Sequence, residues 1–282
     1  MAPNMPAAES PCLFNPIPRI YDEVMGPLYF ESYALATAEK VAAWNPESVL
    51  ETACGTGRVT VHLRQRIPED ATLIATDVNA EMLAFARGKL AGLKDIHWQE
   101  ADAIQLPFPD QSFDVVVCQF GAMFFTDKLK GFSEAFRVLK NDGKYILAVW
   151  DKLDVNPLGA AVRGDLIDFF EGHPPENLRT AYSLADPTLC SDLLNQAGFR
   201  NIAVETLNMP CETESAEQYA KAFVDGSSVR DALHRHASEA VPALQEKIRD
   251  TVIRKFGDHP VRSTMQAILF TASKETSAEL PS

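Results

Sequence analysis

Two glycines and two acids stand at a spacing that suits the binding of a nucleoside. The segment Glu51-Thr-Ala-Cys-Gly55-Thr-Gly57 follows an apolar run, and a second acid, Asp77, ends the next apolar run. Glycine adopts positive φ readily and lets the backbone approach a ligand, so the pair predicts a tight strand-to-helix turn beneath a bound molecule. A carboxylate at Asp77 can accept hydrogen bonds from both hydroxyls of a ribose.

The same loop argues against a bound phosphate. In the dinucleotide-binding fingerprint a third glycine follows the second by three residues, but Thr60 holds that place here. The Gly-Lys-Ser/Thr pattern of phosphate loops is absent from the chain. Ribose recognition without phosphate recognition predicts a neutral or cationic nucleoside.

The elements that must position this loop alternate between short apolar runs and helical segments. We expect strands over 48–53, 72–76, 96–100, 113–119 and 145–150, and helices over 59–66, 80–91 and 129–139. Nearly continuous apolar strands such as Val115–Cys118 indicate a parallel sheet that is covered on both faces. Gly143, in Asn141-Asp-Gly143, is expected to cap the helix before it in the left-handed conformation.

The rest of the chain predicts an arm and a cap around this sheet. Spaced aromatic and apolar residues over 20–44 indicate one or two helices ahead of the glycine loop. Longer helical stretches over 158–170, 187–197 and 216–255 flank a strand near 202–207, and a last strand covers 266–273. We therefore expect disordered tails over 1–12 and 275–282 and one domain over 13–274. This domain divides into a helical arm (13–45), a ligand-binding half (46–152), helical cap segments (153–260) and the last strand (261–274).

Composition narrows the classes of partner. The chain has 282 residues, 46% of them hydrophobic, which is enough for a substantial core, and its formal charge of −13 repels nucleic acid and anionic membranes. The five cysteines are scattered without a Cys-x-x-Cys pair, so we expect neither disulfides nor a zinc site, in a reducing, cytoplasmic setting. No signal peptide and no membrane span is expected. The oligomeric state stays open.

Four motifs together carry a family resemblance. They are Glu51-x-Ala53-x-Gly55-x-Gly57, Asp77, Ala101-Asp102-Ala103 and Leu106-Pro-Phe-Pro-Asp110-x-Ser112-Phe-Asp114. In this order they resemble class I S-adenosylmethionine-dependent methyltransferases, and most nearly the ubiquinone/menaquinone-methyltransferase-like group, from about Tyr21 to Trp150. The family usually has Asp where this chain has Glu51 and Gly where it has Ala53.

The resemblance implies a fold and a set of ligand contacts. The fold is a Rossmann-like, mostly parallel sheet of seven strands with helices on both faces, an N-terminal helical arm, a helical cap, and the last strand inserted antiparallel. The cofactor is S-adenosyl-L-methionine, with no metal. The resemblance implies that Glu51 and the backbone of Ala53, Gly55 and Gly57 contact the methionine part, with Gln119 near the sulfonium. Asp77 is implied for the ribose, Asp102 and Ala103 for the adenine edge, and Val78 and Met82 for the adenine faces. Tyr21 is implied to cover the cofactor from the arm. Capping of the following helices is the alternative for the three acids.

No catalytic residue stands out. His173 is the first candidate to test as a general base, although an ordinary loop residue is the favoured interpretation, and His234-x-His236 suits solvent better than a metal. Cys54 lacks a histidine partner that would make it a nucleophile. Aromatic residues of the arm and of the segment after 113–119 predict either a lid over the ligands or ordinary core: Tyr21, Tyr29, Phe30, Tyr33, Phe124 and Phe125.

These observations predict a small-molecule methyltransferase that acts by direct in-line transfer. We expect C- or O-methylation of an apolar or aromatic metabolite, since Cys118-Gln-Phe-Gly121 lacks the signature associated with methylation of amino groups on bases and glutamine. Two alternatives stay open: an NAD(P)-dependent oxidoreductase, which would need a pyrophosphate site, and a non-catalytic binding protein that retains the fold.

Overall fold

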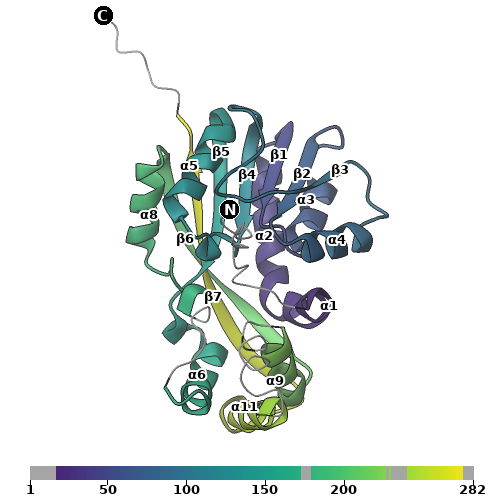
Figure 1. Ribbon diagram of the computed structural model, residues 1–282, viewed down its shortest axis with the longest axis vertical. Coiled ribbons are helices and arrows are strands. Elements are labelled where there is room, and N and C mark those ends of the chain that lie inside the picture. Colours follow the sequence, from purple (N-terminus) through teal and green to yellow (C-terminus); the bar gives the residue numbers. More distant parts are fainter. Residues whose placement is uncertain (1–16, 173–178, 227–228, 230–239, 276–282) are drawn as a thin grey trace, which may run out of the picture.

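A seven-stranded sheet in the order β3-β2-β1-β4-β5-β7-β6 organises the molecule (Figure 1). The computed structural model describes residues 17–172, 179–226, 229 and 240–275. The strands are β1 (Ser48–Thr52), β2 (Thr72–Asp77), β3 (Ile96–Glu100), β4 (Phe113–Gln119), β5 (Leu139–Trp150), β6 (Arg200–Thr213) and β7 (Val261–Ser273). Strands β1 to β5 pair in parallel, and β7 is antiparallel to both β5 and β6. The predicted sheet, including the antiparallel last strand, is confirmed.

Helices cover both faces of this sheet. They are α1 (Pro18–Ile20), η1 (Tyr21–Phe30), α2 (Glu31–Ala43), α3 (Arg58–Arg66), α4 (Ala80–Lys89), η2 (Ala122–Phe124), α5 (Lys128–Val138), η3 (Leu153–Val155), α6 (Pro157–Phe169), α8 (Pro187–Gln196), α9 (Ala216–Asp225) and α11 (Val241–Phe256). The crossovers β1–α3–β2 and β4–α5–β5 leave the centre in opposite directions. Because such crossovers are right-handed, α3 and α5 lie on opposite faces. Side chains of Asn79, Asp127, Asp186 and Ser215 cap α4, α5, α8 and α9.

The arm contains a π-helix that sequence periodicity did not reveal. Its ten residues, Tyr21–Phe30, contain Pro27, which has no N–H to donate. Helix α2 continues directly from it and packs against α3. The arm therefore reaches the glycine loop as one continuous helical unit.

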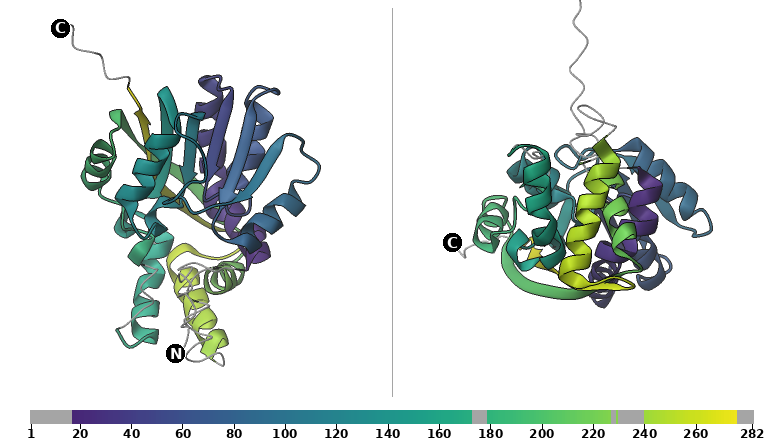
Figure 2. Two further views of the ribbon diagram at one scale, coloured as in Figure 1. Left: turned by 45° about the horizontal axis from the view of Figure 1, so that its top comes forward. Right: turned by 90° about the horizontal axis from the view of Figure 1, so that it is seen from below.

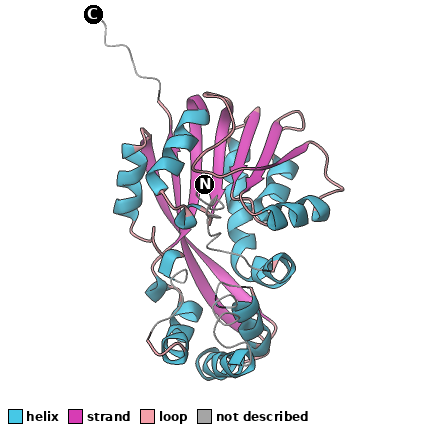
Figure 3. Ribbon diagram, viewed as in Figure 1, coloured by secondary structure: helices cyan, strands magenta, loops and turns pink. Residues whose placement is uncertain are grey.

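The cap is built on a two-stranded extension of the sheet. Strands β5 and β7 pair only as far as Trp150 and Ala267, whereas β6 and β7 stay paired through Thr213 and Val261. This ribbon leaves the sheet, and α6, α9 and α11 gather around it (Figures 2 and 3). Both strands are longer than the expected 202–207 and 266–273. Of the helical stretch expected over 216–255, α9 and α11 are described, and 227–228 and 230–239 lie outside the described residues.

The expected glycine cap at the end of α5 is wrong. Helix α5 ends at Val138, and Leu139 already has extended geometry and begins β5. Asp142, rather than Gly143, takes a positive φ of 63°. Its N–H donates to the carbonyl of Lys274, so the turn belongs to a β-bulge region and not to a helix end.

Carbonyl groups in the last turn of α5 accept hydrogen bonds from a lysine that is distant in the sequence. The buried Lys274 ammonium donates to the carbonyls of Phe136 and Leu139, at 2.8 Å each, and of Arg137 at 3.4 Å. These carbonyls have no partner further along the helix. Lys274 thus ties the end of β7 to the end of α5.

Lys274→Met should lower the free energy of unfolding by about 1–3 kcal/mol, because it leaves buried carbonyls without their donor. Urea denaturation followed by circular dichroism measures the change. Lys94→Met, at an exposed lysine, is the matched control. Equal stability of the two variants would contradict the role given to Lys274.

Candidate functional site

Two adjoining cavities lie at the carboxyl ends of the central strands, where the strand order reverses between β1 and β4. In open α/β sheets ligands bind at this point. We call the smaller, of about 310 Å³, the loop cavity, because the glycine loop lines it. We call the larger, of about 520 Å³, the aromatic cavity. Four aromatic residues line both and form a collar between them: Tyr21, Phe30, Phe120 and Phe124.

The structure brings ten of the eleven expected contact residues together around the loop cavity. They are Tyr21, Glu51, Ala53, Gly55, Asp77, Val78, Met82, Asp102, Ala103 and Gln119. Gly57 is the exception, because it lies behind the loop and begins α3 with a φ of 76°. A Cβ there would lie 3.0 Å from Leu90 Cδ1 and 3.2 Å from the Cβ of Ala86. Gly57 therefore allows α4 to pack closely against the turn.

Asp77 joins the loops that follow β1 and β2. Its Oδ2 accepts the N–H of Gly55 at 2.7 Å, and its Oδ1 accepts the N–H of Asn79 at 2.8 Å. The carboxylate is 8% exposed, and burial raises its pKa. Each oxygen has a further lone pair, so the fixed carboxylate can still accept hydrogen bonds from a ligand.

None of the three acids caps a helix. Helix α4 is capped by Asn79, and the left-handed Gly57 precedes α3 without a side-chain cap. Asp102 accepts the N–H of Ile104 at 3.0 Å in a loop. The capping alternative is therefore not what the structure contains.

Glu51 is a buried acid held by the residue that replaces the third glycine. The Thr60 hydroxyl donates to Glu51 Oε2 at 2.6 Å, and Glu51 is only 2% exposed. Burial raises the pKa of Glu51 to about 8, and the charge of Asp77 adds to this rise, although the Thr60 hydrogen bond opposes it. Burial alone therefore keeps Glu51 mostly protonated at neutral pH. A cation bound beside it favours the carboxylate.

The arm is fastened over the loop cavity by ion pairs. Asp22 is 7% exposed, and its Oδ1 accepts from Arg58 Nη2 at 3.0 Å and from Lys89 Nζ at 2.6 Å. Arg58 also donates to Glu31 at 2.9 Å. Gly26 makes room for this guanidinium, since a Cβ at Gly26 would lie 2.1 Å from Arg58 Nη2. Because both of its Nη atoms are engaged by Asp22 and Glu31, Arg58 offers little to a phosphate in the loop cavity.

Gln119 joins the end of β4 to the arm. Its Oε1 accepts the Thr37 hydroxyl of α2 at 3.0 Å, and its Nε2 donates to the carbonyl of Phe30 at 3.5 Å. The Phe30 ring stacks on Tyr21 with centroids 5.0 Å apart. The collar is thus positioned by hydrogen bonds as well as by packing.

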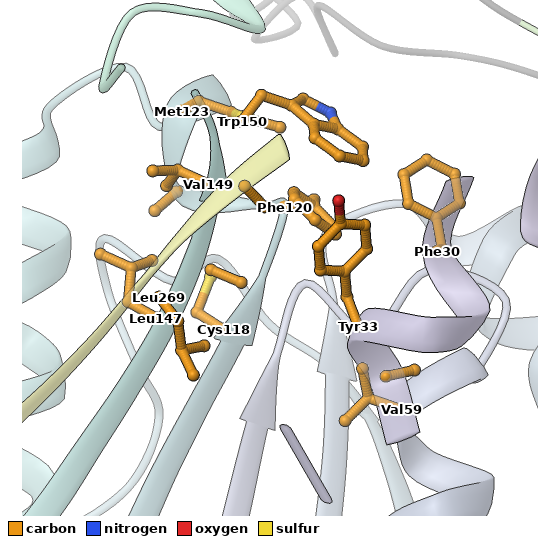
Figure 4. Close-up of a cluster of buried hydrophobic side chains, with 14 of the residues drawn as sticks. Phe30, Tyr33, Val59, Cys118, Phe120, Met123, Leu147, Val149, Trp150 and Leu269 are labelled. Atoms are coloured by element: carbon orange, nitrogen blue, oxygen red, sulfur yellow. The ribbon is translucent and has the colours of Figure 1, made fainter. Parts of the chain in front are cut away.

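The far side of the collar is built from aromatic rings. Phe120 stacks on Trp150 at 3.9 Å between centroids, and Figure 4 shows Phe30 facing this pair. Phe120 holds a positive φ of 55°, which turns its side chain out of the sheet after β4. Tyr29 and Phe124 also line the aromatic cavity, as the lid interpretation predicts. Tyr33 follows the core alternative instead: it lies in the buried cluster (Figure 4), and its hydroxyl donates to the Met265 carbonyl.

The remaining candidates are Phe125, Cys54 and three histidines. Phe125 lines the loop cavity. Cys54 is buried, and burial raises the pKa of its thiol well above the usual range, which suppresses the nucleophilic thiolate. His173, His234 and His236 lie outside the described residues.

Two searches of the described part of the chain exclude simple alternatives there. Its His, Cys, Asp and Glu side chains form no group of three or more that could hold a metal ion. None of its helices combines the length and the apolar character that crossing a membrane requires.

Several site residues were not predicted. Thr60 entered only as a missing glycine, and the Asp22–Arg58–Lys89 cluster joins three separate segments. The Tyr21-Asp22 pair ahead of the glycine loop was the only available signal for this cluster. Phe120 and Trp150 sit at strand ends, where pattern alone does not distinguish core from cavity.

Comparison with known proteins agrees with this geometry. A family model described as "Methyltransferase domain" matches residues 49–143. The chain is 32% identical over 177 residues to demethylmenaquinone methyltransferase of Deinococcus radiodurans, covering 58% of this chain and 73% of that protein. It is 29% identical over 169 residues to the ubiquinone/menaquinone biosynthesis C-methyltransferase UbiE of Cronobacter sakazakii, covering 55% and 67%. The crystal structure of the YcgJ protein from Bacillus subtilis shares the fold, with a TM-score of 0.57, 22% identity and coverage of 87% and 100%.

The raised pKa of Glu51 predicts that the free energy of unfolding of the ligand-free protein falls as pH rises. A buried acid whose folded pKa lies above its unfolded value stabilises the fold below about pH 4.5, and this contribution is lost as pH rises toward 8. Relative to wild type, Glu51→Gln should therefore gain stability between pH 6 and about pH 8. Thermal unfolding across this range measures the gain, with the exposed Glu81→Gln as control. A difference that does not vary with pH would refute the assignment.

Proposed function

The chain belongs to the class I S-adenosylmethionine-dependent methyltransferases of the ubiquinone/menaquinone-methyltransferase-like group, and from this premise we propose that it methylates a carbon atom of an apolar aromatic small molecule. The relatives named for demethylmenaquinone and for C-methylation in quinone biosynthesis support this choice. The observation that carries it is the aromatic collar, through which a cavity suited to an aromatic acceptor meets the cavity suited to the donor.

The loop cavity fits the donor by its chemistry. S-adenosylmethionine presents two ribose hydroxyls, an ammonium and a sulfonium, and no phosphate. The cavity offers the acids Glu51, Asp77 and Asp102, while its arginine, Arg58, is engaged by Asp22 and Glu31. A site of this charge favours a cation and disfavours a pyrophosphate, so the oxidoreductase alternative is not favoured.

We assign the contacts residue by residue. Asp77 accepts from the ribose hydroxyls, and Asp102 with Ala103 meets the adenine edge. Val78 and Met82 flank the adenine faces. Glu51 and the backbone of Ala53 and Gly55 hold the methionine part, with Gln119 beside it. Gly57 supports the turn through packing.

The bound donor supplies an electrophilic methyl group on sulfur. The chain's part is to hold an acceptor atom in line with that methyl, at roughly 3–3.5 Å, and to exclude water. The collar rings suit this role, since aromatic faces attract a cation within about 6 Å. Tyr21 closes the collar from the arm.

Proton removal is limited by the groups available. The described lining of the aromatic cavity contains no histidine and no carboxylate. Burial raises the pKa of Tyr182 to about 12 and those of Tyr21 and Tyr29 further still, so these hydroxyls stay protonated at neutral pH. The acceptor must therefore bring an electron-rich atom of its own, as the ring carbon of a hydroxylated aromatic does. The ring proton is then lost to water after transfer.

The cysteines and the net charge bear on the cellular location and on the class of acceptor. The cysteines Cys54, Cys118, Cys190 and Cys211 are free and buried, which supports a reducing, cytoplasmic location. The charge of −13 supports a small-molecule acceptor rather than nucleic acid. We propose that no metal takes part in the transfer.

S-adenosylmethionine and S-adenosylhomocysteine should each bind with micromolar affinity in a calorimeter. Asp77→Ala removes charge-assisted hydrogen bonds and should weaken binding by about 100-fold. Asp70→Ala, at an exposed acid outside the loop cavity, should bind as wild type does. Absence of binding by the folded wild type, or tighter binding of NADH in a fluorescence titration, would overturn the proposal.

Asp22→Asn should loosen the arm, because it takes the charge from a buried partner of Arg58 and Lys89. We expect about tenfold weaker binding of S-adenosylhomocysteine and faster amide hydrogen exchange over residues 21–30. Glu23→Gln is the control, because it alters the neighbouring acid, whose ion pair within the described residues is with the exposed Arg19. Unchanged exchange in Asp22→Asn would show that the ion pairs do not hold the arm.

A further inference from the structure

We infer that the acceptor carries an anionic group, and that Arg163 and Arg179 bind it at the end of the aromatic cavity away from the collar. This inference rests on the proposed function, because it specifies the acceptor of that reaction. The substrate class it names is an apolar aromatic acid whose carboxylate lies apart from the methylated carbon.

The charges in the aromatic cavity are few and of one sign. Among its described lining residues the side chains charged at neutral pH are Arg163 and Arg179, and none is acidic. The whole chain has 26 basic and 39 acidic residues, so two cations without an acid run against its composition. The other lining residues are mainly aromatic and aliphatic. An apolar cavity with a few placed polar groups is the usual form of a small-molecule site.

Both guanidiniums remain available to a ligand. The acid paired with Arg163 is Asp154 at 3.8 Å, and their side chains are 58% and 87% exposed. An exposed pair at this distance contributes little and is easily exchanged. Arg179 makes no side-chain hydrogen bond or ion pair with the described part of the chain. Arg58 of the loop cavity differs, since the buried Asp22 and the partly buried Glu31 engage it at 3.0 and 2.9 Å.

The two arginines occupy a defined place relative to the collar. Arg163 shares one face of α6 with Gly159, Leu166 and Ile167, which line the same cavity at helical spacing. Neither Arg163 nor Arg179 lines the loop cavity. An acceptor that places its ring at the collar would therefore direct its acidic group toward α6.

A third donor lies in the same region. A Cβ on Gly159 would lie 3.2 Å from the Tyr182 hydroxyl, so this hydroxyl rests against the turn of α6 that precedes Arg163. Arginine presents planar donors that match a carboxylate, and a tyrosine hydroxyl adds one more. These groups distinguish an aromatic acid from a neutral ring of the same size.

The test compares two fluorescent probes that differ by a single acidic group. 8-Anilinonaphthalene-1-sulfonate carries a sulfonate, and N-phenyl-1-naphthylamine is the same ring system without it. Each is titrated into wild type, into R163Q/R179Q and into R249Q/R262Q, with S-adenosylhomocysteine present. The last variant removes the same charge from arginines that pair with acids outside the cavity.

We expect R163Q/R179Q to weaken binding of the sulfonate about tenfold while changing binding of the neutral probe less than about twofold. R249Q/R262Q should bind both probes as wild type does. The single variants R163Q and R179Q give intermediate losses and replace the double variant if it does not fold. Equal losses for both probes, no loss for either, or no sulfonate binding by wild type would overturn the inference.

The outcome is separable from the proposed function. Calorimetry of S-adenosylhomocysteine on the same variants should match wild type, because the arginines lie outside the loop cavity. If the nucleoside binds but the arginine variants retain the sulfonate, the inference alone fails. If wild type binds no nucleoside, the proposed function fails. The probe titration is then carried out without S-adenosylhomocysteine.

Discussion

The burial of two carboxylates, near the point where the strand order reverses, is the constraint on which the rest of the site depends. Glu51 ends up 2% exposed and Asp77 8% exposed because β1 and β2 are central and parallel. Burying acids costs free energy unless they are hydrogen-bonded or neutralised. The protein meets part of this cost with the Thr60 hydroxyl and with backbone N–H groups of the loops. A cationic nucleoside bound beside Glu51 favours the carboxylate over the protonated form that burial favours, so the buried acids provide affinity for the donor.

The arm completes this site from outside the sheet. It begins a stack of aromatic rings that runs from Tyr21 through Phe30 and Phe120 to Trp150. The same arm contributes Asp22 to the ion cluster that grips the loop and α4. The same segment therefore lines both the loop cavity and the aromatic cavity.

The sequence predicted where the loop cavity lies because its signals are local. Glycines at a turn, acids at strand ends and nearly continuous apolar runs each depend on a few neighbouring residues, and ten of the eleven expected contact residues line one cavity. Gly57 and Gly143 show the limit, since the first is explained by packing against α4 and the second by a bulge in β5. The aromatic cavity could not be predicted, because it gathers residues from the arm, the ends of β4 and β5, the interior of β7, and helices α6 and α9. Only tertiary packing decides whether Tyr33 joins the core or the cavity.

The ribbon of β6 and β7 has a consequence for how this enzyme can diversify. Apart from the arm, the described residues that line the loop cavity lie within 49–143, whereas the cap helices follow β5 and surround the ribbon. Insertions or exchanged helices on these two strands would leave β1, β2 and β4 where they are. Such changes would reshape the aromatic cavity without displacing the strands that position Glu51 and Asp77.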